Sequence, residues 1–297
     1  MESIELVELD SADPGPKHRR TVDLIPRQGQ MIKAGEIIDL RGKEALTLQD
    51  QRIYNQLLAN AHGPRMAEPG IEHSIALSEL RRSHKGNERI SVTIKKLMTT
   101  IAETRNTAGR TRRFQLLGGN DMDDEDRPNG MLRYTFDPRL VELMKDSISY
   151  GKLELAVMMA FRSKYALALF EYGSKRVRMS WKTSERLTIG ELRAVLGVPD
   201  GKLTTFPSLK QRAISPALRE VNHLAEFLIS IKPIKTSRIT THVDLAWRKK
   251  SQEEVDVAMA ELDRPTVGRN ARIDGTVEAV RPAEGVSIPP VGTAALP

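Results

Sequence analysis

The spacing of apolar residues predicts three helices followed by two strands in the first half of the chain. The helices are expected at 47–63, 75–86 and 88–104, and the alternating strands at 112–119 and 130–136. Thr47 is suited to cap the first helix, and Gly86 to stop the second. In the third helix the spacing directs Val92, Leu97 and Ile101 inward, and Lys95, Lys96 and Thr99 largely outward. The two strands would form a hairpin around a polar loop.

The same order of elements occurs again in the second half. A helix capped by Ser163 comes first. Thr188 and Glu191 then form a capping box for a second helix, which Gly197 ends. A third, basic helix directs inward Leu209, Ala213, Ala217, Val221 and Leu224.

Pro216 lies inside this third helix. Because proline lacks an N–H and clashes within a helix, it predicts a kink, or a helix that restarts with Ser215 as its cap. Strands at 227–231 and 240–247, around a basic turn, close the second copy. The tetrapeptides SELR and GELR stand 112 residues apart in the two copies. The repeated order helix, helix, basic helix, hairpin predicts an α+β protein with two tandem winged-helix (helix-turn-helix) domains.

The segment Leu155–Leu169 is almost entirely apolar, broken only around Arg162 and Lys164. It is shorter than the roughly 20 residues of a membrane span, and it carries two cations. We predict that it is the buried first helix of the second domain; a surface for a protein partner is the alternative. The acidic opening MESIELVELD does not resemble a secretory signal, so a cytoplasmic protein without membrane association is expected.

Charge is distributed unevenly along the chain, whose formal net charge is +7. Residues 81–113 hold ten Lys and Arg against two acidic residues, and residues 205–250 hold nine against three. Residues 251–297 reverse the sign, with eight acidic residues against four basic ones. Two basic zones favour a polyanionic partner, and double-stranded DNA is the leading one.

These patterns divide the chain into four parts. Residues 1–30 lack sustained periodicity and predict a flexible leader, whereas 251–297 form an acidic tail that is rich in Pro and Gly and expected to be disordered. The N-terminal winged-helix domain is expected at 31–147 and the C-terminal one at 148–250.

The sequence contains no combination of residues that indicates catalysis. It has no cysteine, which excludes disulfides and thiolate metal sites. The six histidines include no His-x-His pair, and the glycines of LLGGN lack the lysine of a phosphate loop. The acidic run DMDDED lacks the glycine and distal glutamate of a calcium loop and is expected to be solvated. We therefore expect no metal, no cofactor and no enzymatic activity.

Three phrases, SKYALALFEY, LTIGELRAVLGV and SLKQRAISPALREVNHL, carry a family resemblance. In this order they resemble the replication initiators (Rep) of iteron-containing plasmids, typified by the F-plasmid initiator. The family pattern ends in a Pro-Ala pair and an acidic-aliphatic-Asn group, here Pro216, Ala217, Glu220, Val221 and Asn222. The resemblance covers 163–247 well and about 45–145 more loosely. Two departures are Gly173 near the end of a helix and the acidic loop 121–126, which is long for a wing.

The candidate DNA contacts lie on the two basic helices and beside them. A helix in the major groove needs side chains that reach base edges, while neighbouring cations hold phosphates. In the C-terminal domain the helix candidates are Lys210, Gln211, Arg212, Ser215 and Arg219, and those of the wing are Lys235 and Arg238. In the N-terminal domain they are Lys95, Lys96 and Thr99 on the helix, and Arg110, Arg112 and Arg113 for the DNA backbone. Asn222 and His223 are expected to cap or pack.

The predicted function is that of a plasmid replication initiator that binds direct repeats at the origin. The resemblance implies that several bound copies distort the duplex and recruit the host initiator and helicase, without cutting DNA. It also implies that a dimer binds an inverted repeat and represses its own gene. Two alternatives remain: a transcription repressor with no role in replication, and a nickase or primase.

Overall fold

The computed structural model describes residues 20–68, 70–83, 89–105 and 109–276. Residues up to Asp263 belong to one unit, and those from Arg264 to a second that contains α12 (Arg269–Ile273). Most of the predicted leader (1–19), the predicted stop at Gly86 and the last part of the predicted tail (277–297) lie outside the described residues.

The described part of the chain begins with three short elements, η1 (Thr21–Asp23), β1 (Gln30–Ala34) and α1 (Gly35–Ile38). The amide of Thr21 donates to the carbonyl of Ser147 over 2.8 Å, and Val22 is buried. Thr21 and Val22 therefore pack against the domain, and the prediction of a flexible leader is wrong for this part of it, whereas Ile25 and Arg27 are exposed.

The first predicted set of helices follows. It consists of α2 (Leu48–Ala61), the short η2 (Pro64–Ala67), α3 (Leu77–Ser83) and α4 (Ile90–Thr99). A strand, β2 (His73–Ala76), precedes α3. Thr47 caps α2 as predicted, in a reciprocal capping box with Asp50 that satisfies two backbone donors at the helix start.

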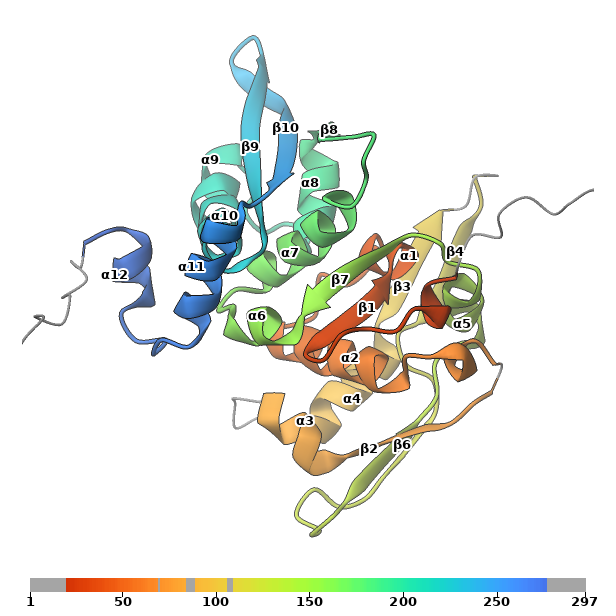
Figure 1. The fold of residues 1–297 in the computed structure, drawn as a ribbon. Helices are drawn as coiled ribbons and strands as arrows, with labels where there is room; N and C mark the ends of the chain where they lie inside the picture. Colours follow the sequence, from red (N-terminus) through yellow and green to blue (C-terminus); the bar gives the residue numbers. More distant parts are fainter. Residues whose placement is uncertain (1–19, 69, 84–88, 106–108, 277–297) are drawn as a thin grey trace, which may run out of the picture. The chain divides into compact units, whose positions relative to one another are not determined.

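Four further strands follow α4, and they pair differently from the prediction. They are β3 (Ile101–Arg105), β4 (Thr111–Gln115), β5 (Asn120–Met122) and β6 (Met131–Tyr134). β4 pairs with β3, and β6 pairs with β2 and β5, so the predicted hairpin between 112–119 and 130–136 is wrong. The wing of this domain is β5–β6, of which β5 lies in the supposed polar loop and β6 in the strand predicted at 130–136. β3–β4 is an extra hairpin between α4 and the wing (Figure 1).

Four elements lead from the first domain into the second. They are α5 (Pro138–Lys145), β7 (Tyr150–Glu154), α6 (Leu155–Ala160) and α7 (Lys164–Arg176). β7 pairs with β1 and so joins residues on both sides of the boundary predicted at 147. The apolar segment is two helices, not one, because α6 ends at Ala160 and Ser163 caps α7. Its core role is confirmed, since Leu167, Leu169 and their neighbours are fully buried.

The second domain repeats the strand order of the first. Its elements are β8 (Ser184–Thr188), α8 (Ile189–Leu196), α9 (Phe206–Leu209), η3 (Lys210–Ile214), α10 (Ser215–Leu224), β9 (Phe227–Thr236) and β10 (Ile239–Lys249). The sheet order β8–β10–β9 has the same arrangement as β2–β6–β5, with the last strand in the middle. Both domains therefore have the winged-helix topology that the repeated pattern predicted.

α7 lies between the two domains and packs against β7 on one side and α8 and α10 on another (Figure 1). Gly173, the departure noted in the sequence, does not end this helix. A Cβ at Gly173 would lie 2.6 Å from side-chain atoms of Phe227 and of Ile229 on β9, so the absence of a side chain allows β9 to approach α7 closely.

The residues after β10 continue into α11 (Gln252–Leu262), which a capping box of Ser251 and Glu254 begins. Ala258 is buried, and the Glu261 carboxylate lies 3.7 Å from Nε2 of His223 on α10. The prediction of a disordered tail is therefore wrong for residues 252–262, which form a helix packed on the second domain.

Candidate nucleic-acid interface

The basic helix of the second domain has one buried and one exposed face. The predicted inward residues, Leu209, Ala213, Ala217, Val221 and Leu224, are all fully buried. The opposite side exposes Lys210, Gln211, Arg212 and Arg219, while Ser215 is half-buried. The structure thus brings the five candidates together on this helix, and the charged ones among them, Lys210, Arg212 and Arg219, are exposed to solvent.

Pro216 is accommodated without a break. Residues 210–214 form a π-helical turn in which the amide of Ser215 donates to the carbonyl of Lys210, five residues back. The backbone hydrogen bonds of this turn already reach five residues back instead of four. The N–H that Pro216 lacks therefore leaves fewer backbone carbonyls without a donor. Ser215 has helical φ and ψ and no capping hydrogen bond, so the prediction that it restarts the helix as its cap is wrong.

Arg193, the arginine of GELR, holds the turn that leads to this helix. Its guanidinium donates to the carbonyls of Leu203 and Lys202 over 2.7 and 2.6 Å. Asn222 fixes the other end, because its side chain both donates to and accepts from the backbone of Ile229. The expected packing role of Asn222 is confirmed, and Arg193 is a structural residue that the sequence reasoning missed.

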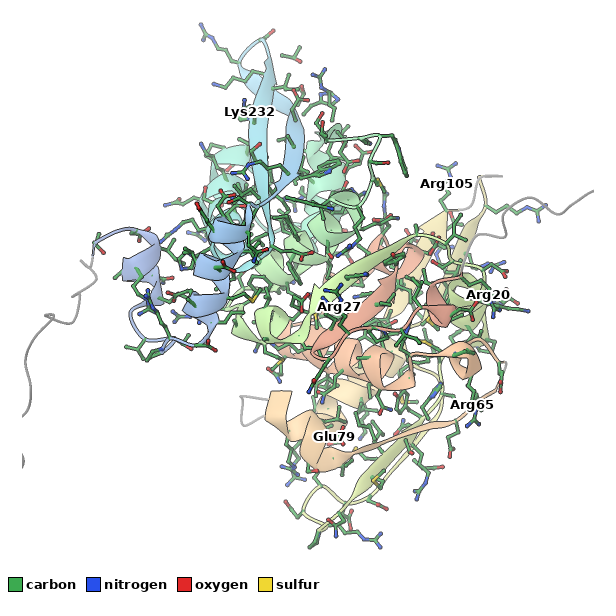
Figure 2. The ribbon with its side chains drawn as sticks, in the orientation of Figure 1. Arg20, Arg27, Arg65, Glu79, Arg105 and Lys232 are labelled. Atoms are coloured by element: carbon green, nitrogen blue, oxygen red, sulfur yellow. The ribbon has the colours of Figure 1, made fainter. Side chains whose placement is uncertain are left out.

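The wing β9–β10 extends beyond the helices of its domain (Figure 1). Lys232, labelled in Figure 2, lies on it, and Lys235 and Arg238 are exposed nearer its tip. The strands are longer than predicted, and the turn that joins them consists of Ser237 and Arg238. The structure therefore places two predicted wing contacts at the tip of one basic hairpin.

In the first domain, the phase of α4 differs from the prediction. The buried residues are Ile90, Thr93, Ile94 and Leu97, whereas Val92 is 46% exposed. Ile101 is 48% exposed and belongs to β3. Among the three candidates of this helix, Lys95 and Thr99 are exposed, but the outward placement of Lys96 needs correction.

Lys96 is half-buried and turned to Asp50 of α2, with 2.7 Å between its Nζ and Oδ2 of Asp50. Asp50 is almost fully buried and also accepts from the hydroxyl of Thr93 and the amide of Thr47. Burial opposes the ionisation of Asp50, but these donors outweigh it and lower its pKa. One carboxylate thus caps α2 and anchors α4, and Lys95 is the more exposed of the two lysines on this helix.

The arginines predicted for the DNA backbone lie on or beside β4, on the extra hairpin. Arg112 contacts Glu142 at 2.9 Å, and Arg113 contacts Glu103 at 3.1 Å. Together with Arg110 and Arg139 they line an open groove. All three predicted arginines are exposed, and ion pairs at such exposure are weak, worth about 0–1 kcal/mol. A phosphate can therefore compete for these guanidinium groups.

The wing of the first domain is acidic, and Glu125 folds back from it onto α4. The Glu125 carboxylate accepts from the amides of Ile90 and Ser91 over 3.2 and 3.0 Å. Arg81, the arginine of SELR, lies 3.6 Å from the same carboxylate. Although burial opposes ionisation, these amides and Arg81 lower the pKa of Glu125. The acidic run is thus partly a helix cap, not simply a solvated loop as predicted.

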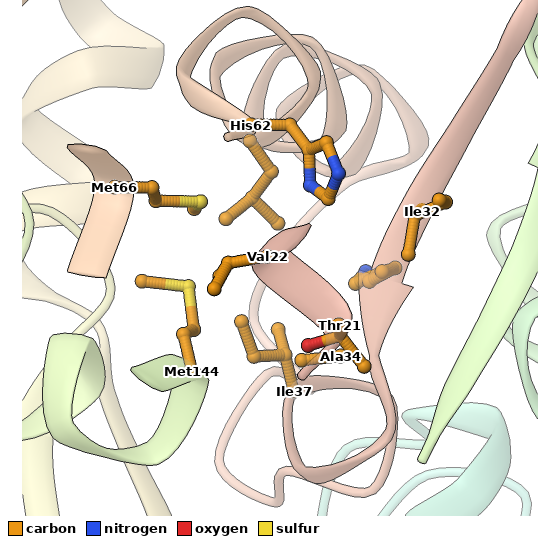
Figure 3. A pocket seen from close by; sticks show the side chains of 10 residues that line it. Thr21, Val22, Ile32, Ala34, Ile37, His62, Met66 and Met144 are labelled. Atoms are coloured by element: carbon orange, nitrogen blue, oxygen red, sulfur yellow. The ribbon is translucent and has the colours of Figure 1, made fainter. Parts of the chain in front are cut away.

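The described residues contain no grouping of His, Asp or Glu that would hold a metal ion. A small gap lies near β1 and α2, lined mainly by apolar side chains, among which Val22, Met66 and Met144 converge (Figure 3). Its lining also includes Lys33, which pairs with Glu171 at 2.8 Å, and His62, whose Nε2 lies 2.8 Å from the carbonyl oxygen of Leu24. Among the described helices, none has the length and apolar character that a membrane crossing requires.

The chain matches two models of a protein family. Residues 30–174 match the initiator replication protein, WH1, and residues 188–247 match the initiator Rep protein, WH2. Among solved structures, domains 2 and 3 of RctB, as selenomethionine derivatives, match with a TM-score of 0.41 and 10% identity. That match covers 76% of this chain and 95% of the other, but its score adds nothing to the fold assignment. No curated protein matches the chain significantly.

The two family matches lie in chain order and together span most of the described residues. The first match contains the β2–β6–β5 sheet with α3 and α4, and the second contains α8 to α10 and most of the β9–β10 hairpin. The chain therefore belongs to the family of initiator Rep proteins, DNA-binding proteins of two winged-helix domains that act in the initiation of replication.

Proposed function

We propose that this protein is a plasmid replication initiator that binds direct repeats (iterons) at its origin, with the α9–α10 helix in the major groove. The observation that carries the proposal is the division of this helix into a fully buried apolar face and an exposed face. The exposed face presents Lys210, Gln211, Arg212 and Arg219. Arginine and lysine are suited to guanine, and Gln211 to adenine.

The first domain adds a second contact in this proposal. Lys95 and Thr99 face solvent on α4, and Arg112 and Arg113 lie on the neighbouring β3–β4 hairpin. Two winged helices one helical turn of DNA apart would cover roughly 20 base pairs on one face of the duplex. That length suits a direct repeat read by a monomer.

Several bound copies would then distort the duplex and recruit the host initiator and helicase. A dimer of the same protein would bind an inverted repeat at its own promoter and repress transcription. The proposal places the protein in the cytoplasm and gives it no strand-cleaving or other catalytic activity, in keeping with a sequence that has no His-x-His pair and no phosphate-loop lysine after LLGGN.

The test is footprinting of the full chain on the DNA that flanks its own gene, combined with permanganate probing of unpaired thymines. Protection of regularly spaced direct repeats, with melting of an adjacent A+T-rich stretch, is the expected result. Protection of a single inverted repeat without melting would assign the protein to transcription repression. Strand cleavage in the presence of magnesium would refute the non-enzymatic part of the proposal.

Arg212→Ala tests the placement of the helix. We expect a loss of about 1–3 kcal/mol on the specific site, with weaker discrimination between sites. Arg27→Ala removes the same charge from an exposed position outside both winged-helix sheets and is the matched control. An equal loss on specific and random DNA would show that Arg212 contacts phosphate instead of bases.

A further inference from the structure

The tip of the β9–β10 wing carries an exposed aliphatic side chain among cations. Ile239, the first residue of β10, is 71% exposed. It follows the turn residues Ser237 and Arg238, and Ser237 adopts a left-handed φ of 58°. A tight two-residue hairpin turn requires a positive φ at its first residue, so Ser237 and Arg238 form a compact tip directly before Ile239.

A β-bulge directs Ile239 away from the core. Val243 and Leu245 of β10 are fully buried, and strict alternation would place Ile239 on their side of the strand. The pairing register shifts at Thr241, which adds one residue to β10. Ile239 therefore lies on the opposite side, in line with His242. Bulges commonly re-aim a side chain in this way.

The charge around Ile239 is entirely positive or neutral in the sequence. Residues 227–243 contain Lys232, Lys235 and Arg238 and no acidic residue. The wing at the same topological position in the first domain has the opposite character, because it carries the acidic run with Glu125. This contrast points to DNA, not a generic hairpin surface, as the partner of the second wing.

We propose that Ile239 is an apolar wedge that enters the minor groove next to Arg238 and selects DNA that is easily deformed. An aliphatic side chain inserted at a base step partly unstacks it and bends the duplex, while adjacent cations hold the phosphates. The wedge favours flexible pyrimidine–purine steps such as TA over stiff A-tracts. It rests on the proposed function and adds to it a specificity residue that makes no hydrogen bond to a base.

The experiment compares the full-length wild type with Ile239→Thr on the repeat that footprinting identifies. Threonine keeps the β-branched shape and strand preference, so the hairpin is retained. Bending is measured by energy transfer between the DNA ends, on two duplexes with a TA step or an A-tract at the site the wing protects. Ile25→Thr makes the same change at a position that is 87% exposed and outside both sheets.

The wild type and Ile25→Thr should bend the TA duplex and prefer it to the A-tract. Ile239→Thr should bend it less, lose the preference, and bind the TA duplex roughly three- to tenfold more weakly, as expected for one partly buried aliphatic side chain. Unchanged bending and step preference in Ile239→Thr would overturn the wedge while leaving repeat binding intact. If the wild type protects no repeat, the proposed function itself fails.

Discussion

The buried ion pair between Lys33 of β1 and Glu171 of α7 gives a sharp prediction about how the fold is held together. Its two side chains are only 3% and 7% exposed, and Nζ lies 2.8 Å from Oε2. Asn55 of α2 completes the group, because its carbonyl accepts from Lys33 and its amide donates to Glu171 over 2.8 and 2.7 Å. Three elements therefore meet at one satisfied polar cluster.

Removing one partner leaves a buried charge without compensation. Lys33→Met and Glu171→Gln should each lower the free energy of unfolding by about 3–5 kcal/mol. The double variant Lys33→Met/Glu171→Leu should recover only part of this loss. Asn55 then keeps only the weak contact of its amide with Sδ of Met158 at 3.5 Å, and a poorly satisfied buried amide costs about 1–3 kcal/mol.

The assay is urea unfolding followed by circular dichroism near neutral pH. Glu142→Gln is the control, because its partner Arg112 is 43% exposed and such a pair contributes about 0–1 kcal/mol. Losses below 1 kcal/mol for both Lys33→Met and Glu171→Gln would refute the reasoning, since they would mean that water reaches the cluster.

The same pair predicts a pH dependence. Burial opposes ionisation of Glu171, but Lys33, Lys43 and Asn55 outweigh it and lower its pKa below the unfolded value of about 4.3. The stabilising contribution is therefore complete above that pH and is lost as the pH falls through the folded-state pKa. The difference in stability between the wild type and Glu171→Gln should shrink over that acidic range.

Three further predictions concern helix packing and the first domain. Gly173→Ala should destabilise the protein by about 1–3 kcal/mol in urea unfolding, because the new Cβ would overlap side chains of β9. This loss should exceed the gain in helix propensity from alanine. An unchanged stability would show that β9 shifts to make room for the methyl group. Lys95→Ala should lower the slope of log affinity for DNA against log salt concentration by about 0.9. Lys96→Ala should mainly reduce the stability of the fold, because it removes the ion pair with Asp50. Equal effects of the two variants on the salt slope would contradict this assignment. Glu125→Gln should cost about 1 kcal/mol in thermal unfolding, the range of a lost helix cap, and no cost would show that other groups satisfy the amides at the start of α4.

The features that the sequence predicted best depend on neighbouring residues. The capping box of Thr188 and Glu191, the left-handed end of that helix at Gly197 and the N-cap Ser163 are all present. Each arises within a few residues of chain, where side-chain chemistry and backbone geometry decide the outcome together. The buried face of the α9–α10 helix was predictable for a related reason, because its spacing is regular.

The errors concern contacts between distant segments. Residues 112–119 alternate like a strand in either pairing, and only the fold decides that β4 joins β3 and leaves β6 to β2. Which side of α4 is buried also depends on distant segments, because Asp50 of α2 and Glu125 of the wing both form hydrogen bonds with residues of α4. Among the candidate DNA contacts, Lys96 was misjudged for this reason: the sequence does not show that the partner Asp50, 46 residues earlier, lies under it.

The two domains share a topology but cannot hold DNA in the same way. In the second, the wing is basic and the α9–α10 helix presents its cations on one face. In the first, the equivalent wing carries the acidic run, which would be repelled by phosphates, and Glu125 already occupies the start of α4. Contacts of the first domain are therefore expected from the exposed part of α4 and from the arginines of the β3–β4 hairpin. That hairpin has no counterpart in the second domain, and in this arrangement it supplies the positive charge that the acidic wing does not.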